Sequence, residues 1–434
     1  MSASRIAQRV ATAAALALLP ATAPTQEAPH GGIERTIVGE GFSQIKIAIP
    51  DAETPDSHAE IADELVQTVR DDLLFGGLFD VVDPKFYRLV PRPADGTVAH
   101  DDWLSIGADA LVRIRVPVQD DRIDLEAHLY DNRSKTGLFG RRYGGERDAL
   151  RRVAHLLADD IIKHYTGRPG VAMTRIVFVS FHEGNKEIYL MDYDGRRVRR
   201  LTTSGTLNLS PAWSPDGTEL AFMSWRGRQP GVYVMTSEGQ LGALKTVGGE
   251  LSSAPDWAPD GRRLAYTSDI DGNTEIYVLF RDTGRNTRLT HSPAIDTAPA
   301  FSPNAREIAF TSDRSGSPQI YVMDADGLNV RRLSWEGSYN DSPAWSPRGD
   351  RLAYASRVDG RFQVALLDLA SGSVTYLTRG AHNNENPRWS PDGRHLVFSS
   401  DRAGSYQIHT MRADGSDVRR LTRGLPGFTP DWSR

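Results

Sequence analysis

Apolar and polar residues follow two different patterns along this chain. Up to about residue 165, stretches of strict alternation are mixed with stretches that place an apolar residue at every fourth position. Alternation predicts β-strands, and the fourfold spacing predicts amphipathic helices. The predicted strands are 44–50, 109–118 and 122–130, and the predicted helices are 58–75 and 147–165. This part of the sequence therefore predicts a small α/β domain, followed by a Gly- and Pro-containing hinge at 166–170.

The remainder of the chain repeats one pattern about every 44 residues. Its marker is Pro-x-Trp or Pro-x-Phe, found at Pro211/Trp213, Pro255/Trp257, Pro299/Phe301, Pro343/Trp345, Pro387/Trp389 and Pro430/Trp432. Each of the first five markers is followed by a turn such as Ser-Pro-Asp-Gly and then by three more short runs, the last of which commonly ends in Leu-Thr. Four short strands bounded by turns are typical of a β-propeller blade.

The phase of the repeat predicts how the propeller closes. The first unit starts at Ile176 without a marker of its own, whereas the sixth marker comes after the last complete unit. A terminal strand that pairs with the first blade explains both observations and leaves no unpaired edge, whereas a solenoid would need capping units. We therefore predict a six-bladed β-propeller closed by a carboxy-terminal strand, with the repeated Trp side chains packed between blades.

The amino terminus is typical of a secretory signal peptide. Arg5 and Arg9 precede an apolar run at 10–19 that is followed by small residues, and this run is too short to span a bilayer. No later apolar stretch is long enough, so we expect a mature protein outside the cytoplasm without a transmembrane segment. The predicted divisions are a signal peptide over 1–27 with cleavage within 21–28, an α/β domain with a flexible leading segment over 28–166, and the propeller over 171–434.

Composition and the missing motifs narrow the function. With 51 basic and 56 acidic residues, the net charge of −5 argues against general nucleic-acid binding. The chain has no cysteine, no Gly-x-Ser-x-Gly elbow, no His-Glu-x-x-His and no glycine-rich phosphate loop. We therefore predict no catalytic, cofactor-binding or metal-binding residues, and a binding protein rather than an enzyme. A secreted peptidase-like propeller and a glycan-binding propeller are the alternative interpretations.

The segments that lead into the first strand of each blade form the predicted binding face. They are expected to be loops around the mouth of the central channel, and they vary in sequence while the frame repeats. The candidates are Ser252, Ser253, Ala254, Asp296, Thr297, Asn340, Asp341, Asn384 and Glu385. Because several are acidic, a cation such as calcium at the channel mouth is conceivable, but no coordination set is fixed.

Several of these features together resemble the TolB family of the periplasmic Tol-Pal system. They are the signal peptide, the α/β domain, the junction from Thr166-Gly167 to Arg175-Ile176, the Trp335-Glu336-Gly337-Ser338-x-Asn340 loop and the terminal Pro430-x-Trp432-Ser433. The blade motif alone is shared with many propellers, whereas this combination and its order are much more specific.

The resemblance implies a periplasmic adaptor that supports outer-membrane integrity and cell division, acting as a monomer within a complex. It implies binding of Pal, the peptidoglycan-associated lipoprotein, through the mouth residues named above. It also implies binding of TolA through the segment after the signal peptide, with Ile33, Glu34, Ile37 and Val38 as candidates. The alternation over 33–38 suits either strand addition to a partner's sheet or a first strand of the domain itself.

Overall fold

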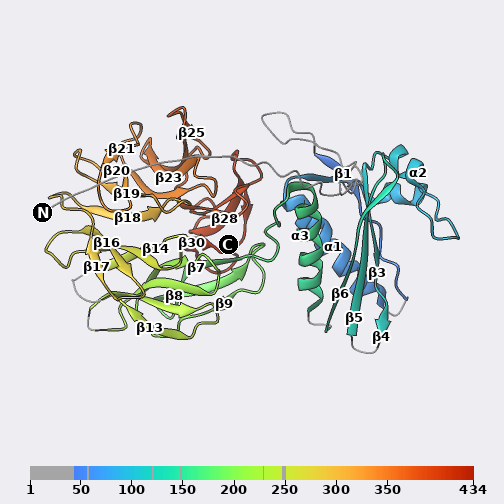
Figure 1. The fold of residues 1–434 in the computed structure, drawn as a ribbon, viewed down its shortest axis with the longest axis horizontal. Helices are drawn as coiled ribbons and strands as arrows, with labels where there is room; N and C mark the ends of the chain where they lie inside the picture. Colours follow the sequence, from blue (N-terminus) through green and yellow to red (C-terminus); the bar gives the residue numbers. More distant parts are fainter. Residues whose placement is uncertain (1–43, 56–57, 120–121, 147–148, 228, 247–250) are drawn as a thin grey trace, which may run out of the picture. The chain divides into compact units, whose positions relative to one another are not determined.

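A computed structural model describes residues 44–434, apart from 56–57, 120–121, 147–148, 228 and 247–250 (Figure 1). The predicted signal peptide with its cleavage site, and the TolA-binding candidates Ile33, Glu34, Ile37 and Val38, lie outside the described residues. Among the residues that are described, no helix is both long enough and apolar enough to cross a membrane.

The amino-terminal domain is a mixed sheet with two long helices. Its elements are β1 (Ile45–Ala48), α1 (Ala59–Phe75), β2 (Phe79–Val81), η2 (Pro84–Leu89), α2 (His100–Ser105), β3 (Ala110–Arg115), β4 (Val118–Gln119), β5 (Arg122–Asp131), β6 (Thr136–Glu146) and α3 (Leu150–Thr166). The strand order is β2-β1-β3-β5-β4, with β6 also paired to β5. Apolar faces of α1 and α3 pack with the sheet in one buried cluster, which includes Leu65, Val112 and Leu157. The predicted α/β domain is confirmed.

Strand β6 is the main element that alternation did not predict. It contains four glycines and three basic or acidic residues, so its sequence has no regular apolar face. Tertiary contacts explain part of this composition. A Cβ at Gly140 would lie 2.9 Å from the ring of His128 on β5, so a side chain there would displace its neighbour. The contacts with the neighbouring strand β5 therefore determine this strand more than its own apolar and polar pattern does.

The rest of the described chain forms six four-stranded sheets, arranged as the blades of a propeller (Figure 1). Blade 1 is β30 (Phe428–Trp432), β7 (Arg175–His182), β8 (Asn185–Asp192) and β9 (Arg199–Arg200). Blade 2 is β10 (Asn208–Trp213), β11 (Glu219–Ser224), β12 (Gly231–Thr236) and β13 (Leu241–Lys245). Blade 3 is β14 (Ser252–Trp257), β15 (Arg263–Ser268), β16 (Glu275–Phe280) and β17 (Asn286–Arg288). Blade 4 is β18 (Asp296–Phe301), β19 (Glu307–Ser312), β20 (Gln319–Asp324) and β21 (Arg331–Arg332). Blade 5 is β22 (Asn340–Trp345), β23 (Arg351–Val358), β24 (Arg361–Asp368) and β25 (Val374–Tyr376). Blade 6 is β26 (Asn384–Trp389), β27 (His395–Ser400), β28 (Gln407–Arg412) and β29 (Arg419–Arg420).

The ring closes through blade 1, as the phase of the repeat predicts. Strand β30 pairs antiparallel with β7, and Trp432 lies opposite Ile176. The backbone N–H of Arg175 donates to Ser433 Oγ at 2.9 Å, and the N–H of Ser433 donates to the Arg175 carbonyl at 2.8 Å. Trp432 is buried, and its Nε1 donates to Thr174 Oγ1 at 2.7 Å. The two ends of the propeller sequence therefore share one sheet.

The hydroxyl of the repeated Leu-Thr sequence has the same structural role in every blade. In blade 3, for example, the backbone N–H of Ile276 donates to Thr290 Oγ1 at 2.9 Å. The equivalent hydroxyls accept at 2.8 to 3.0 Å from the third strand of the other five blades, with Lys245 replacing leucine in blade 2 and Ser334 replacing threonine in blade 4. The buried hydroxyl satisfies a backbone donor beyond the end of the short fourth strand. This explains a repeat feature that packing alone does not require.

A buried polar cluster connects the two long helices with blade 1. Asp72 of α1 lies 2.7 Å from His155 Nδ1 of α3 and also accepts a hydrogen bond from the hydroxyl of Tyr193. Burial, together with the Asp72 carboxylate, holds the pKa of Tyr193 well above its usual range, so that hydroxyl stays a donor. On the next turn of α3, Asp159 accepts from the backbone N–H groups of Ala172 and Met173. The side chains of Asp72, His155, Asp159 and Tyr193 are all buried.

His409 makes the stability of the propeller depend on pH. It stacks on Phe398 in blade 6, at the position where four other blades place a tyrosine ring next to that of a Phe or Tyr. Burial lowers the pKa of His409 to about 4. The unfolded chain therefore binds a proton near the ordinary histidine pKa of about 6.5, whereas the folded chain does not, so stability is lost as the pH falls from about 6.5 to 4.

Replacing this histidine with the tyrosine of the other blades should remove that loss. Between pH 6.5 and 4, His409→Tyr should lose about 1–3 kcal/mol less unfolding free energy than the parent chain. Urea unfolding followed by circular dichroism at both pH values measures the difference. An identical pH dependence in the two proteins would contradict the assignment.

Candidate functional site

Strand pairing identifies one edge of the propeller as the candidate site. In blade 5, Asn340 of β22 pairs with Ser356 of β23, which pairs with Gln363 of β24. The start of each first strand, the hairpin between the second and third strands, and the end of each fourth strand therefore lie at the same edge. We call this edge the mouth.

Four of the predicted binding residues are buried at the mouth and serve the structure. The prediction that they lie in loops is wrong. They are the first residues of the innermost strands: Ser252, Asp296, Asn340 and Asn384. Asn340 Nδ2 donates to Gln319 Oε1 of the preceding blade at 2.7 Å, and Asn384 Nδ2 donates to Gln363 Oε1 at 3.0 Å. Asp296 accepts from Arg314 Nη2 at 2.8 Å. These contacts fix the connections at the mouth.

The residues that follow these four are half-buried and alternate with them. They are Ser253, Thr297, Asp341 and Glu385. Asp341 accepts from Thr311 Oγ1 at 2.8 Å, and Glu385 accepts from the Tyr406 hydroxyl at 2.5 Å. Burial and the neighbouring carboxylates of Asp401 and Asp341 raise the pKa of Glu385, although the Tyr406 hydrogen bond opposes this. Among the predicted residues on the innermost strands, these four half-buried side chains are the ones that a partner at the mouth could contact.

Below the mouth, the central channel narrows between six irregular strand segments. The residue before each repeated proline has φ between 41° and 56°: Ser210, Ala254, Ala298, Ser342, Asn386 and Thr429. Strand pairing shifts at each of these positions, so every innermost strand contains a β-bulge. The bulged residues and five of the six prolines that follow them line a hollow of about 70 Å³. Ala254, the remaining predicted residue, lies in this constriction.

The channel wall carries three charged side chains next to the bulges. Asp256 accepts from the backbone N–H of Phe301 at 2.8 Å, and Asp431 accepts from that of Trp213 at 2.7 Å. Arg388 lies 3.6 Å from Asp431. Burial raises the pKa of Asp256 to about 6, although Arg388 acts in the opposite direction. Within the described part of the chain no group of three suitable side chains could hold a metal ion; calcium at the mouth stays a prediction.

Large apolar side chains at the mouth are the feature that the sequence reasoning missed. Each is more than two-fifths exposed, and they come from blades 1 to 4: Phe181, Trp225, Ile270, Ile295 and Trp335. Trp335 is 74% exposed, and the Arg332 guanidinium lies 4.6 Å from the centre of its ring. Trp225 and Trp335 stand outside the repeated Pro-x-Trp positions, and this irregularity was the available signal. Exposed aromatic side chains of this kind are typical of protein-binding surfaces.

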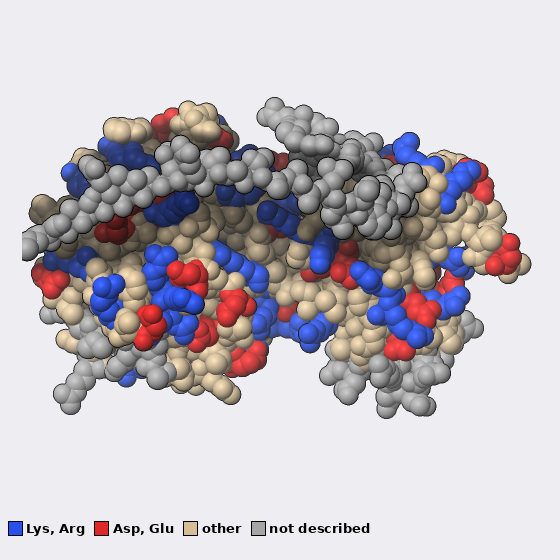
Figure 2. All heavy atoms as spheres, in the orientation of Figure 1, with Lys and Arg blue, Asp and Glu red and all other residues tan. Residues whose placement is uncertain are grey.

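Charges elsewhere on the propeller are mixed. On the face that Figure 2 shows, Lys and Arg side chains are interspersed with Asp and Glu. Many charged side chains of the propeller are in ion pairs, such as Arg331–Glu307 at 2.7 Å. That face therefore has no extended field of one sign, in keeping with the small net charge of the chain.

Two family descriptions match the chain. The TolB beta propeller domain matches residues 162–387 and 341–434, which together make up more than half of the chain, and the TolB amino-terminal domain matches residues 34–138. The first match includes every strand of the propeller, and the second includes β1 to β5 and the start of β6.

Curated proteins named "Tol-Pal system protein TolB" are similar to parts of the chain. The protein of Geobacter sulfurreducens is 38% identical over 162 residues, which cover 37% of this chain and 38% of that relative. The protein of Anaeromyxobacter dehalogenans is 35% identical over 222 residues, which cover 50% of this chain and 49% of that relative. The chain thus spans about two-fifths to one half of the length of these curated relatives.

Solved structures extend the similarity over both domains. The crystal structure of TolB from Acinetobacter baumannii matches with a TM-score of 0.78 and 28% identity, and the match covers 90% of this chain and 97% of that one. A chain of a nidogen/laminin complex matches with a TM-score of 0.50 and 12% identity, which shows the propeller fold alone. The family matches support the prediction of a non-enzymatic propeller protein. Because the propeller and the amino-terminal domain both match, the chain belongs to the TolB family.

Proposed function

We propose that the chain is a periplasmic adaptor of the Tol-Pal system. It binds a Pal-like peptidoglycan-associated lipoprotein through the propeller mouth and TolA through its amino-terminal segment. Through these two contacts it supports the integrity of the outer membrane and its constriction during division. Membership of the TolB family supports this proposal, as do relatives that carry the name of the Tol-Pal system.

The observation that carries the Pal-binding part is the group of exposed apolar side chains at the mouth. Trp225 and Trp335 offer large, rigid surfaces that gain free energy when a partner covers them. The connection that carries Trp335 is held by the buried Asn340–Gln319 hydrogen bond, and the backbone N–H of Trp225 donates to the Leu207 carbonyl at 3.0 Å. Ordering these segments should therefore cost little free energy on binding. The half-buried Asp341 and Glu385 add acceptors beside this apolar surface.

Binding of a purified Pal-like lipoprotein domain tests this part directly. Isothermal titration calorimetry should show at least a ten-fold weaker affinity for the double variant Trp225→Ala/Trp335→Ala, because the loss of two interface aromatics costs about 2 kcal/mol or more. The control is Val198→Ala/Leu241→Ala, which removes exposed apolar side chains away from the mouth. Unchanged affinity of the mouth variant, or equal losses in both variants, would exclude the mouth as the Pal-binding surface.

The TolA-binding part needs a separate comparison. A chain without residues 24–38 should fail to retain TolA in a pull-down while retaining the Pal-like domain. Retention of TolA by the shortened chain would contradict the assignment to this segment, and it would leave the Pal-binding experiment unaffected.

A further inference from the structure

The junctions between blades form notches at the edge opposite the mouth, and one of them is occupied by the chain itself. Between blades 6 and 1, Phe75 at the end of α1 stacks on His395 with a centroid distance of 4.3 Å and an angle of 16°. Its edge meets Tyr193 at 4.9 Å. The Arg419 guanidinium lies 5.3 Å from the centre of the Phe75 ring. An aromatic side chain from a helix end is thus held between an imidazole, a phenol and a guanidinium.

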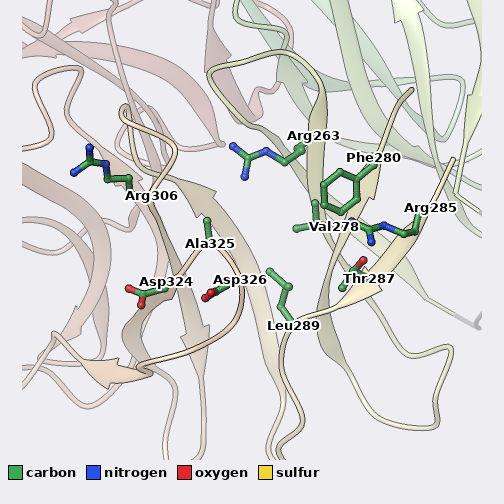
Figure 3. Close-up of a pocket in the computed structure, with 10 residues that line it drawn as sticks. All are labelled: Arg263, Val278, Phe280, Arg285, Thr287, Leu289, Arg306, Asp324, Ala325 and Asp326. Carbon is green, nitrogen blue, oxygen red and sulfur yellow. The ribbon is translucent and has the colours of Figure 1, made fainter. Parts of the chain in front are cut away.

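The same positions recur three blades away, between blades 3 and 4, but there they enclose a hollow of about 470 Å³ (Figure 3). The repeat places Arg263 where blade 6 has His395, because both begin the second strand of their blade. It places Ala325 where blade 1 has Tyr193, because each is the first residue after the third strand. The smaller alanine leaves this notch open. We call it the blade 3/4 notch.

The floor of the blade 3/4 notch is apolar. Val278 and Leu289 are buried there, and Phe280 forms one side of the hollow. An aromatic ring placed on this floor would be removed from water on one face, as Phe75 is in the occupied notch. Arg263 would contact its other face through a cation–π interaction, in the position from which His395 stacks on Phe75.

The rim of the notch is rich in guanidinium groups. Arg285 lies 4.3 Å from the centre of the Phe280 ring, and Arg306 lines the hollow on the blade 4 side. In the described part of the chain, neither of these two arginines forms an ion pair, whereas Arg263 pairs with Asp260 at 2.8 Å. Two carboxylates lie on the blade 4 side of the notch, as Arg306 does: Asp324 and Asp326 accept hydrogen bonds from Asn329 and Leu328. The rim groups that remain free to donate hydrogen bonds to a partner are therefore the guanidinium groups of Arg285 and Arg306.

We propose that the blade 3/4 notch is a docking site for an acidic segment of a partner protein that presents an aromatic side chain. Two arginines without carboxylate partners favour an acidic occupant. The apolar floor beside Arg263 and Phe280 favours an aromatic ring. The segment that fills the occupied notch is itself acidic and aromatic, since the last turns of α1 carry Asp71 and Asp72 before Phe75.

A peptide copied from this chain is a suitable probe. The peptide Asp-Asp-Leu-Leu-Phe-Gly-Gly, residues 71–77, has the sequence that the equivalent notch accommodates. Titrated into the full chain with ¹³C-labelled methyl groups, it should produce saturable shifts of the Ala325, Val278 and Leu289 methyl signals. Replacing its phenylalanine with alanine should weaken binding at least ten-fold, and raising the salt concentration should weaken it further.

Substitutions in the chain locate the binding. Ala325→Tyr restores the bulk that Tyr193 has in blade 1, and should reduce affinity for the peptide at least ten-fold. The matched control is Ala370→Tyr in the corresponding turn of blade 5, an exposed position at which affinity should be unchanged. Arg306→Gln should weaken binding several-fold without affecting the fold.

Three outcomes would overturn the proposal. The first is the absence of methyl shifts at the notch at millimolar peptide. The second is binding that persists in Ala325→Tyr. The third is equal binding of the phenylalanine and alanine peptides with complete displacement by inorganic phosphate, which would show a simple anion site. Each outcome is independent of Pal and TolA binding.

Discussion

Trp432→Ala is expected to lower the free energy of unfolding of the propeller by about 3–5 kcal/mol, because it leaves a cavity where β30 closes the ring. Trp432 is buried against blade 1, next to Phe75, and it also donates a hydrogen bond to Thr174. Urea unfolding monitored by circular dichroism measures the loss. Trp432→Phe should lose much less, because Phe301 occupies the equivalent position of blade 4.

The control for this substitution is Trp335→Ala at the mouth. Both variants lose the same side chain, but Trp335 is 74% exposed, so its removal should change stability by about 0.5 kcal/mol or less. Equal losses in the two alanine variants would mean that closure by β30 contributes little. Removing residues 429–434 altogether should destabilise the ring at least as much as Trp432→Ala, since it exposes the edge of β7.

Asp72→Ala should destabilise the contact between α1, α3 and blade 1 by about 2–4 kcal/mol. The carboxylate accepts from His155 and Tyr193 in a buried cluster, and its loss leaves both donors without an acceptor. Chemical unfolding with separate probes of the two domains should show an earlier transition for the amino-terminal domain.

The adjacent residue supplies the control. Asp71 is exposed, and within the described residues its side chain accepts a hydrogen bond from Gln67 one turn earlier in α1. Asp71→Ala should therefore be close to neutral. If the two aspartate variants unfolded together with the parent chain, the buried cluster would not stabilise the contact between α1 and blade 1.

The repeat made most of the fold predictable from the sequence, because each blade must place the same residue types at the same positions. The spacing of Pro211 to Pro387 located the blades, and the displaced marker at Trp432 located the closing strand. Strand β6 was not predictable in this way, because its glycines are explained by neighbours such as His128 on another strand.

The mouth could be predicted as a region but not residue by residue. The polarity of Asn340 and Asn384 suggested exposure, whereas both are buried, and a glutamine on the preceding blade accepts a hydrogen bond from the side-chain N–H of each. Polarity alone does not distinguish a solvated side chain from a buried one that has a partner. The exposed Trp225 and Trp335 could be recognised only once the blades were placed, because tryptophan is also the repeated core residue.

The shared sheet of blade 1 also determines the order in which the propeller can fold. Blades 2 to 6 contain contiguous strands and can form from local contacts. The edge of β7 that faces away from β8 must wait for β30 at the far end of the sequence. Contacts between such distant residues form slowly, because a long loop must close first. We therefore expect a transient species with five complete blades and an open edge at β7, which chaperones or a premature partner strand could recognise.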